Sequence, residues 1–119
     1  MTSIQDVLEE LNRIGGVRGS ALVTADGIMI ASALREKSAD DVVAGLASFL
    51  IATTRRTLEE SSLGKFNRFV LTATHGKLVL LDLGESFLVV LTDQFARLDQ
   101  CLQEVQEAAR QIRRLAQIA

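Results

Sequence analysis

The chain has 119 residues, of which 48% are hydrophobic and 24% charged, with a net charge of −2. This length predicts one domain with a substantial core, and the apolar content argues against disorder. Scattered charges of both signs give neither the basic field that nucleic acids require nor a polybasic membrane patch. Residues 1–6 lack a basic start followed by an apolar run, and no apolar stretch of about 20 residues occurs. We therefore expect a cytoplasmic protein that binds no nucleic acid and inserts into no membrane.

The first predicted element is an amphipathic helix over residues 3–14. Apolar side chains recur along it at intervals of three and four residues, the spacing of one helix face. Ser3 and Asp6 match the Ser-x-x-acid signal of a helix start. Gly15-Gly16 suits the left-handed backbone of a helix end. We therefore expect a short helix with one buried side.

A hairpin is predicted next. Val17 to Thr24 and Ile28 to Ala33 are both rich in apolar and β-branched residues, as strands are. Asp26-Gly27 lies between them, and this pair favours a type I′ turn, in which both central residues have positive φ. So short a connection requires the two strands to be antiparallel neighbours.

The long helix predicted over Ser38 to Ser62 is the most informative element. Ser38 and Asp41 form a second start signal, and Gly64 lies near its end. Its apolar residues sweep roughly 200° around the axis, well beyond the ~100° stripe of a surface helix, so we expect burial on more than one side. We expect a partner helix along the remaining arc of small residues with charges at its ends. This arc contains Asp41, Gly45, Ser48, Ala52, Arg55 and Glu59.

Three further strands are predicted over Phe66 to Thr74, Lys77 to Leu83 and Ser86 to Thr92. The pairs His75-Gly76 and Gly84-Glu85 separate them, so they should form an antiparallel meander. The last two strands do not alternate with polar residues. We therefore expect helices on both faces of the sheet.

The final predicted helix begins near Asp93, which suits an N-cap. Its apolar residues form one stripe, and arginines near its end suit the negative pole of the helix dipole. Cys101 occupies an apolar position of this helix, which favours a buried reduced thiol over an exposed reactive one. The stripe consists of Phe95, Leu98, Leu102, Val105, Ala109, Ile112 and Leu115.

No motif in the sequence predicts catalysis or cofactor binding. Gly15 to Gly19 runs from helix into strand, and neither Gly64-Lys65 nor Gly76-Lys77 is followed by Ser or Thr, so none is a phosphate-binding loop. The single histidine, His75, cannot form a multi-histidine metal site. Paired acids are explained by helix ends and solvated surfaces, and the hydroxyl side chains have no neighbouring histidine base. We expect no cofactor, no metal and no catalytic centre.

The order helix, hairpin, long helix, meander, helix resembles the roadblock family, also called the dynein light-chain roadblock group, which includes the bacterial gliding-polarity regulator. The resemblance rests on GSALVTADGIMIASAL over Gly19 to Leu34 and on GKFNRFVLTATHGKLVLLDLGESFLVVLT over Gly64 to Thr92. It implies a single domain over residues 1–119, of α/β (α+β) class. That fold resembles profilin and longin, with one five-stranded antiparallel sheet between helices in the order αββαβββα.

Roadblock domains typically pair through the central helix and the edge strand after it, here Ser38 to Ser62 and Phe66 to Thr74, so the resemblance implies a homodimer. With the helices antiparallel about a two-fold axis, Asp41 of one chain faces Arg55 or Arg56 of the other. Pairing of the edge strands also removes an apolar aggregation liability. The implied self-association residues are Asp41, Gly45, Ser48, Ala52, Arg55, Phe66, Arg68 and Val70.

The resemblance implies a non-catalytic module that binds and regulates a Ras-like small GTPase, with or without stimulating hydrolysis. Arg56, Glu59 and Glu60 are the implied partner-binding residues, and Arg56 is the candidate for an arginine that enters the GTPase site. A structural scaffold subunit, as in dynein or signalling assemblies, is the alternative. A small-ligand sensor ranks third, because Asp82 is the one charged residue within Leu78 to Leu83 and Phe87 to Leu91.

Overall fold

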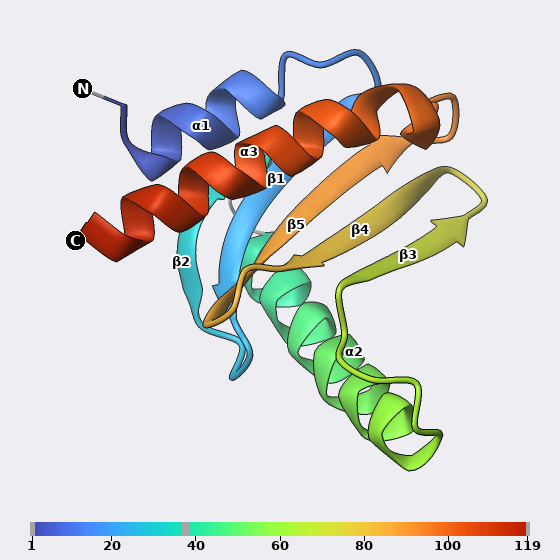
Figure 1. Cartoon of the computed structure of the whole chain (residues 1–119). Coiled ribbons are helices and arrows are strands. Elements are labelled where there is room, and N and C mark those ends of the chain that lie inside the picture. The colour runs from blue at the N-terminus through green and yellow to red at the C-terminus, as the bar shows by residue number, and fades with distance from the viewer. Residues whose placement is uncertain (1, 37–38, 119) are drawn as a thin grey trace.

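The computed structural model describes residues 2–36 and 39–118, which form one antiparallel sheet with helices on both faces (Figure 1). The strands lie in the order β2-β1-β5-β4-β3, and all neighbours are antiparallel. This confirms the predicted five-stranded sheet and the order αββαβββα. The elements are α1 (Ile4–Leu11), β1 (Val17–Thr24), β2 (Met29–Ala33), α2 (Asp40–Glu60), β3 (Arg68–Ala73), β4 (Gly76–Asp82), β5 (Ser86–Asp93) and α3 (Leu98–Ile118).

Each face of the sheet has its own apolar core. α1 and α3 pack together over one face, where Leu8, Leu88 and Ile112 are fully buried (Figure 1). α2 crosses the other face and covers Phe87 with Ile51. Consecutive residues of a strand point to opposite faces, so Phe87 and Leu88 belong to different cores. Burial on both faces explains why β4 and β5 are apolar almost throughout.

The start of α1 is confirmed as a capping box. Ser3 Oγ accepts a hydrogen bond from the Asp6 backbone N–H at 3.1 Å, and Ser3 N–H donates to Asp6 Oδ2 at 3.0 Å. The hydrogen bond from the Ser3 backbone N–H, and after it the Ser3 side chain, hold the pKa of the Asp6 carboxyl below its ordinary value. The predicted start of the central helix at Ser38 lies outside the described residues. In the described part of the chain, α2 begins at Asp40, and Ala39 is the residue before it.

The turn between β1 and β2 differs from the predicted type I′. Gly27 has φ of 90°, whereas Asp26 is not among the described residues with positive φ. Gly27 N–H donates to Thr24 O at 3.1 Å, and Thr24 N–H donates to Ile28 O at 2.9 Å. The connection is therefore a three-residue turn closed by one left-handed glycine, and β2 starts at Met29 rather than Ile28.

The last helix begins at Leu98, so the prediction that it starts near Asp93 is wrong. Asp93 still belongs to β5, because it pairs with Gly76 and its N–H donates to Gly16 O at 2.8 Å. Its carboxylate accepts a hydrogen bond from Phe95 N–H at 2.9 Å, which stabilises the turn after the strand. Phe95 consequently lies in the loop and is 79% exposed instead of belonging to the buried stripe.

The bounds of the edge strand also differ from the prediction. β3 begins at Arg68, so Phe66 precedes it. Ala73 pairs with Gly76, which makes Thr74 and His75 the two turn residues in place of the predicted His75-Gly76. The position of β3 at the end of the sheet is as predicted.

Candidate functional site

The side of α2 that faces away from the sheet is unusually apolar. Val42, Leu46 and Phe49 are 70%, 40% and 66% exposed. The expectation that this helix is buried on more than one side is therefore wrong for the single chain. Exposed clusters of large apolar side chains mark interaction surfaces. The residues that α2 buries are Val43, Ala44, Ala47 and Ile51.

The strip of small residues lies on one flank of α2, next to the β1–β2 turn. Ser48 is half-buried, and its Oγ donates to Ala25 O at 2.9 Å, so this side chain is held within its own chain. Asp41 and Gly45 before Ser48, and Ala52 after it, lie on the same flank at helical spacing and are exposed. Three of these four predicted contact residues are therefore accessible.

Two other predicted self-association residues meet at Phe87 in the chain's own core. The Arg55 guanidinium carbon lies 4.9 Å from the centre of the Phe87 ring, a cation–π contact. Phe66 is 5% exposed, and its ring centre lies 5.9 Å from that of Phe87. Both side chains thus stabilise the junction between α2 and the segment that leads to β3.

The end of α2 carries the predicted partner-binding residues. Arg56, Glu59 and Glu60 are all exposed. The last turn, residues 57–60, contains both glutamates and no lysine or arginine. Because the C-terminal end of a helix carries a partial negative charge, this turn is a negatively charged tip.

β3 presents an open edge beside α2. It pairs with β4 and ends the described sheet, and its residues are exposed except for half-buried Phe69. Val70 lies opposite Val79, which belongs to the core under α1 and α3, so Val70 and Arg68 point to that face. Leu71 is 41% exposed and points to the α2 face. The unpaired backbone of β3 is available to another strand.

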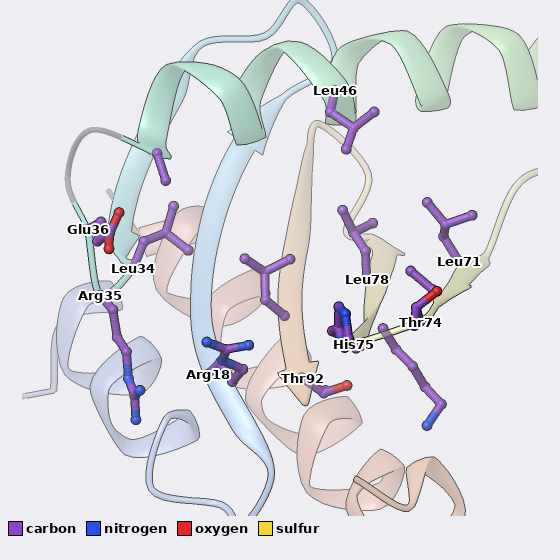
Figure 2. A pocket seen from close by; sticks show the side chains of 15 residues that line it. Arg18, Leu34, Arg35, Glu36, Leu46, Leu71, Thr74, His75, Leu78 and Thr92 are labelled. Atoms are coloured by element: carbon purple, nitrogen blue, oxygen red, sulfur yellow. The ribbon is translucent and has the colours of Figure 1, made fainter. Parts of the chain in front are cut away.

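A groove opens on the sheet between the first half of α2 and the β3–β4 hairpin (Figure 2). Its volume is about 780 Å³. Leu46 points into it from α2, while Leu78 and Leu71 line it from the sheet (Figure 2). Leu34, just after β2, and Leu91 of β5 complete the apolar lining. No local sequence pattern indicates this groove, because its lining comes from segments far apart in the chain.

The charged lining of the groove is mostly basic. Arg18, Arg35 and Lys77 line it with one acid, Glu36, but the Lys77 ammonium donates to Ala96 O, in the loop before α3, at 3.0 Å. Figure 2 shows Arg18 and Arg35 on the side of the groove away from α2. His75, in the β3–β4 turn, is exposed and also lines it. The groove therefore combines an apolar lining with the guanidinium groups of Arg18 and Arg35.

The described residues offer little for catalysis. Among them, no three or more His, Cys, Asp or Glu side chains gather as a metal site would require. In the same residues, no helix combines the length and the apolar character needed to cross a membrane. Cys101 is buried in α3 as predicted, and burial raises the pKa of its thiol. The candidate site is thus the surface made by α2, the β3 edge and the groove.

Comparisons with known proteins agree with this fold. Residues 3–92 match the family model described as Roadblock/LC7 domain. An uncharacterised protein of Methanocaldococcus jannaschii is 36% identical over 110 residues, which cover 92% of this chain and 96% of the relative. The solved structure of Myxococcus xanthus MglB has a TM-score of 0.91 at 18% identity, covering 100% of this chain and 98% of that one. Acanthamoeba castellanii profilin IB gives 0.59 at 16% identity, covering 98% and 100%, which confirms the profilin-like fold.

Proposed function

The chain belongs to the Roadblock/LC7 domain family, and from that premise we propose that it is a homodimeric, non-catalytic module that binds and regulates a Ras-like small GTPase. The observation that carries the proposal is the apolar outer side of α2. Val42 and Phe49 expose large apolar surfaces to water on this side. Removing such surface from water is favourable, so burial against another protein is favoured.

Two chains pair in this proposal through β3 and α2. Antiparallel β3 strands about a two-fold axis satisfy each other's free edge and join the two sheets. The two α2 helices then run antiparallel on one face of the joined sheet. Leu46 belongs to this contact, because it lies on the flank of α2 that shares the groove with Leu71 of β3. Arg68 and Val70 on β3, and Gly45 and Ala52 on α2, remain predicted contacts.

The GTPase binds, in this proposal, on the outer side of the paired helices. Val42, Phe49 and Arg56 are spaced by seven residues, so they share one stripe of α2. All three are exposed in the chain. Two such stripes related by the two-fold axis make an apolar surface with charged ends, where Glu59 and Glu60 also lie.

A nucleotide-dependent pull-down from source-cell lysate tests this function. We expect the chain to retain a small GTPase, identified by mass spectrometry, in a non-hydrolysable GTP analogue and to lose it in GDP. Phe49→Asp should abolish the capture, because it places a charge in the apolar stripe. Phe95→Asp is the matched control, since Phe95 is also exposed (79% against 66%) but lies in the loop before α3. Capture of other proteins, equal in both nucleotides, would contradict GTPase regulation and favour the scaffold subunit.

Hydrolysis measured with the captured GTPase separates two mechanisms. We expect stimulation through the switch regions, so Arg56→Ala should lower the single-turnover rate by less than about tenfold. An arginine inserted into the GTPase site is worth about 10³–10⁵-fold. A loss of that size with Arg56→Ala would overturn the switch-region mechanism and assign the arginine role to Arg56.

A further inference from the structure

A β-bulge at the start of β1 turns a charged side chain onto the α2 face of the sheet. The register with β5 shifts between Val17 and Gly19, so Arg18 is an extra residue in the strand. Val17 packs into the core under α1 and α3, and Ser20 donates to α1 from the same face. Residues three apart in a regular strand point to opposite faces, so the bulge reverses the alternation at this point. Arg18 consequently lines the groove on the α2 face.

The floor of the groove is a row of leucines across the sheet, which we call the leucine row: Leu34, Leu91, Leu78 and Leu71. Leu91 of β5 pairs with Leu78 of β4, which pairs with Leu71 of β3. On β1 the row meets Gly19, and Leu34 packs where a side chain would stand, since a Cβ atom at Gly19 would lie 3.0 Å from Leu34 Cδ2. From β1 to β3 the row crosses β5 and β4, a span of about 14 Å. It thus offers an extended apolar surface beside α2.

Two guanidinium groups stand at one end of the leucine row. Figure 2 shows Arg18 and Arg35 on the Leu34 side of the groove. Both side chains are exposed, and within residues 2–36 and 39–118 neither forms an ion pair. Glu36 is the one acid among the described lining residues, so this end carries an excess of positive charge. Such guanidinium groups beside an apolar surface suit an anion that also has an apolar part.

The groove has the size and character of a small-molecule site. Its volume of about 780 Å³ lies within the roughly 300–1,000 Å³ of such sites, which are mostly apolar with few polar groups. Leu78 is only 7% exposed, so the centre of the leucine row is recessed below the surface. A lipid surface takes up protruding apolar side chains, whereas a recess is filled by a single molecule. A guanidinium group binds a carboxylate through two parallel hydrogen bonds, which fixes the end of such a molecule.

We propose that the groove binds a single-chain aliphatic carboxylate, with its chain along the leucine row and its carboxylate held by Arg18 and Arg35. The site is contained in one chain, so it is a ligand site in addition to the surfaces proposed for pairing and for the GTPase. Val42, Phe49 and Arg56, the stripe assigned to the GTPase, are outside its lining. Binding removes apolar surface of the chain from water, and the carboxylate sets its direction in the groove.

An NMR titration of the isotope-labelled chain with decanoate, below its micellar concentration, tests the site. We expect saturable shifts of the backbone amide signals of Gly19, Leu78 and Leu91, which lie along the leucine row. Decyltrimethylammonium has the same chain with a cationic head. It should bind at least about fivefold more weakly, because the guanidinium groups attract a carboxylate and repel a cation. Vesicles of anionic phospholipid should not sediment with the chain.

Substitutions at the charged end test the carboxylate contact. Arg18→Gln and Arg35→Gln should each raise the dissociation constant for decanoate at least about threefold, since each removes a charged hydrogen-bond donor. Arg35 lies outside the strands, so its variant leaves the bulge unchanged. Glu36→Gln should lower the constant, because it removes the acid of the lining. Arg110→Gln is the control for loss of one positive charge: Arg110 is exposed on α3, on the other face of the sheet, and a change of less than about twofold is expected.

Several results would overturn the site. Decanoate could give no saturable shifts, or shifts centred on the exposed Phe49 and Phe95, which would be adsorption to apolar side chains. Equal affinity for decanoate and decyltrimethylammonium, arginine variants that bind like Arg110→Gln, or weaker binding by Glu36→Gln would exclude the carboxylate contact. Sedimentation with vesicles without saturable binding of decanoate would assign the surface to a membrane. Circular dichroism of each variant establishes that the fold is unchanged, as expected for exposed side chains.

Discussion

Ser20 joins the first helix to the sheet through a buried hydrogen-bond network. Its side chain is fully buried in β1, and its one hydroxyl proton is shared between Leu8 O, 3.0 Å from Oγ, and Asn12 Oδ1, 2.8 Å from Oγ. Asn12 Nδ2 in turn donates to Ala33 O of β2 at 2.6 Å. Buried polar groups are tolerated when they are hydrogen-bonded in this way. The network therefore fixes α1 over β1 and β2.

Ser20→Ala should lower the free energy of unfolding by about 1–3 kcal/mol, because it leaves Leu8 O and the oxygen of half-buried Asn12 without their donor. Urea denaturation measures the change. Ser61→Ala is the control: its hydroxyl also donates to a backbone oxygen, Thr57 O at 2.6 Å, but it is exposed at the end of α2. We expect less than about 0.5 kcal/mol there. Equal losses in both variants would contradict the role assigned to the buried network.

At the scale of the elements, the sequence predicts the bounds of a strand where the residues that set those bounds lie in or next to the strand. β1 has the predicted bounds, because its apolar residues lie within the segment and Gly15-Gly16 directly precedes it. The end of β5 was mispredicted, because Asp93 is held by Gly76 of β4 and by Gly16, and neither is a neighbour in the sequence. Aspartate suits both an N-cap and a turn, so its own signal does not distinguish them.

The candidate site was predicted in part for a similar reason. The apolar arc of α2 is wider than its own sheet covers, since Val42 and Phe49 are exposed. The helical wheel alone does not say which part of the arc the chain buries, so Val42 and Phe49 were expected inside and are exposed. Ser48 was assigned to a partner helix, whereas its hydroxyl bonds to the β1–β2 turn, whose position depends on the fold of the sheet.

Leu46→Ala tests the flank of α2 assigned to the dimer. Leu46 is 40% exposed in the chain, so we expect little loss of chain stability but a dimer dissociation constant about tenfold higher, as for an apolar anchor of an interface. Ile30→Ala is the matched control, because Ile30 is 49% exposed on β2, the opposite edge of the sheet. Sedimentation equilibrium measures both. Weakening by Ile30→Ala with no effect of Leu46→Ala would place the interface at the other edge.

At the scale of the whole molecule, the two faces of the sheet are covered unequally. α1 and α3 cover one face together, while α2 covers part of the other and leaves the groove beside it (Figures 1 and 2). The outward apolar side chains of α2, the groove and Leu71 of β3 all lie on this second side. One side of the molecule thus closes over its own core, and the other carries the exposed surfaces to which we assign association.

Hydrogen–deuterium exchange across protein concentration tests pairing through β3 and α2 most directly. The backbone amides of an unpaired edge strand exchange quickly, and a strand joined on both sides is protected. We predict that β3 and the last turns of α2 become protected as concentration rises and lose this protection on dilution. β2, the other edge strand, should change little and serves as the internal reference. Equally fast exchange of β3 at all concentrations would contradict the proposed dimer.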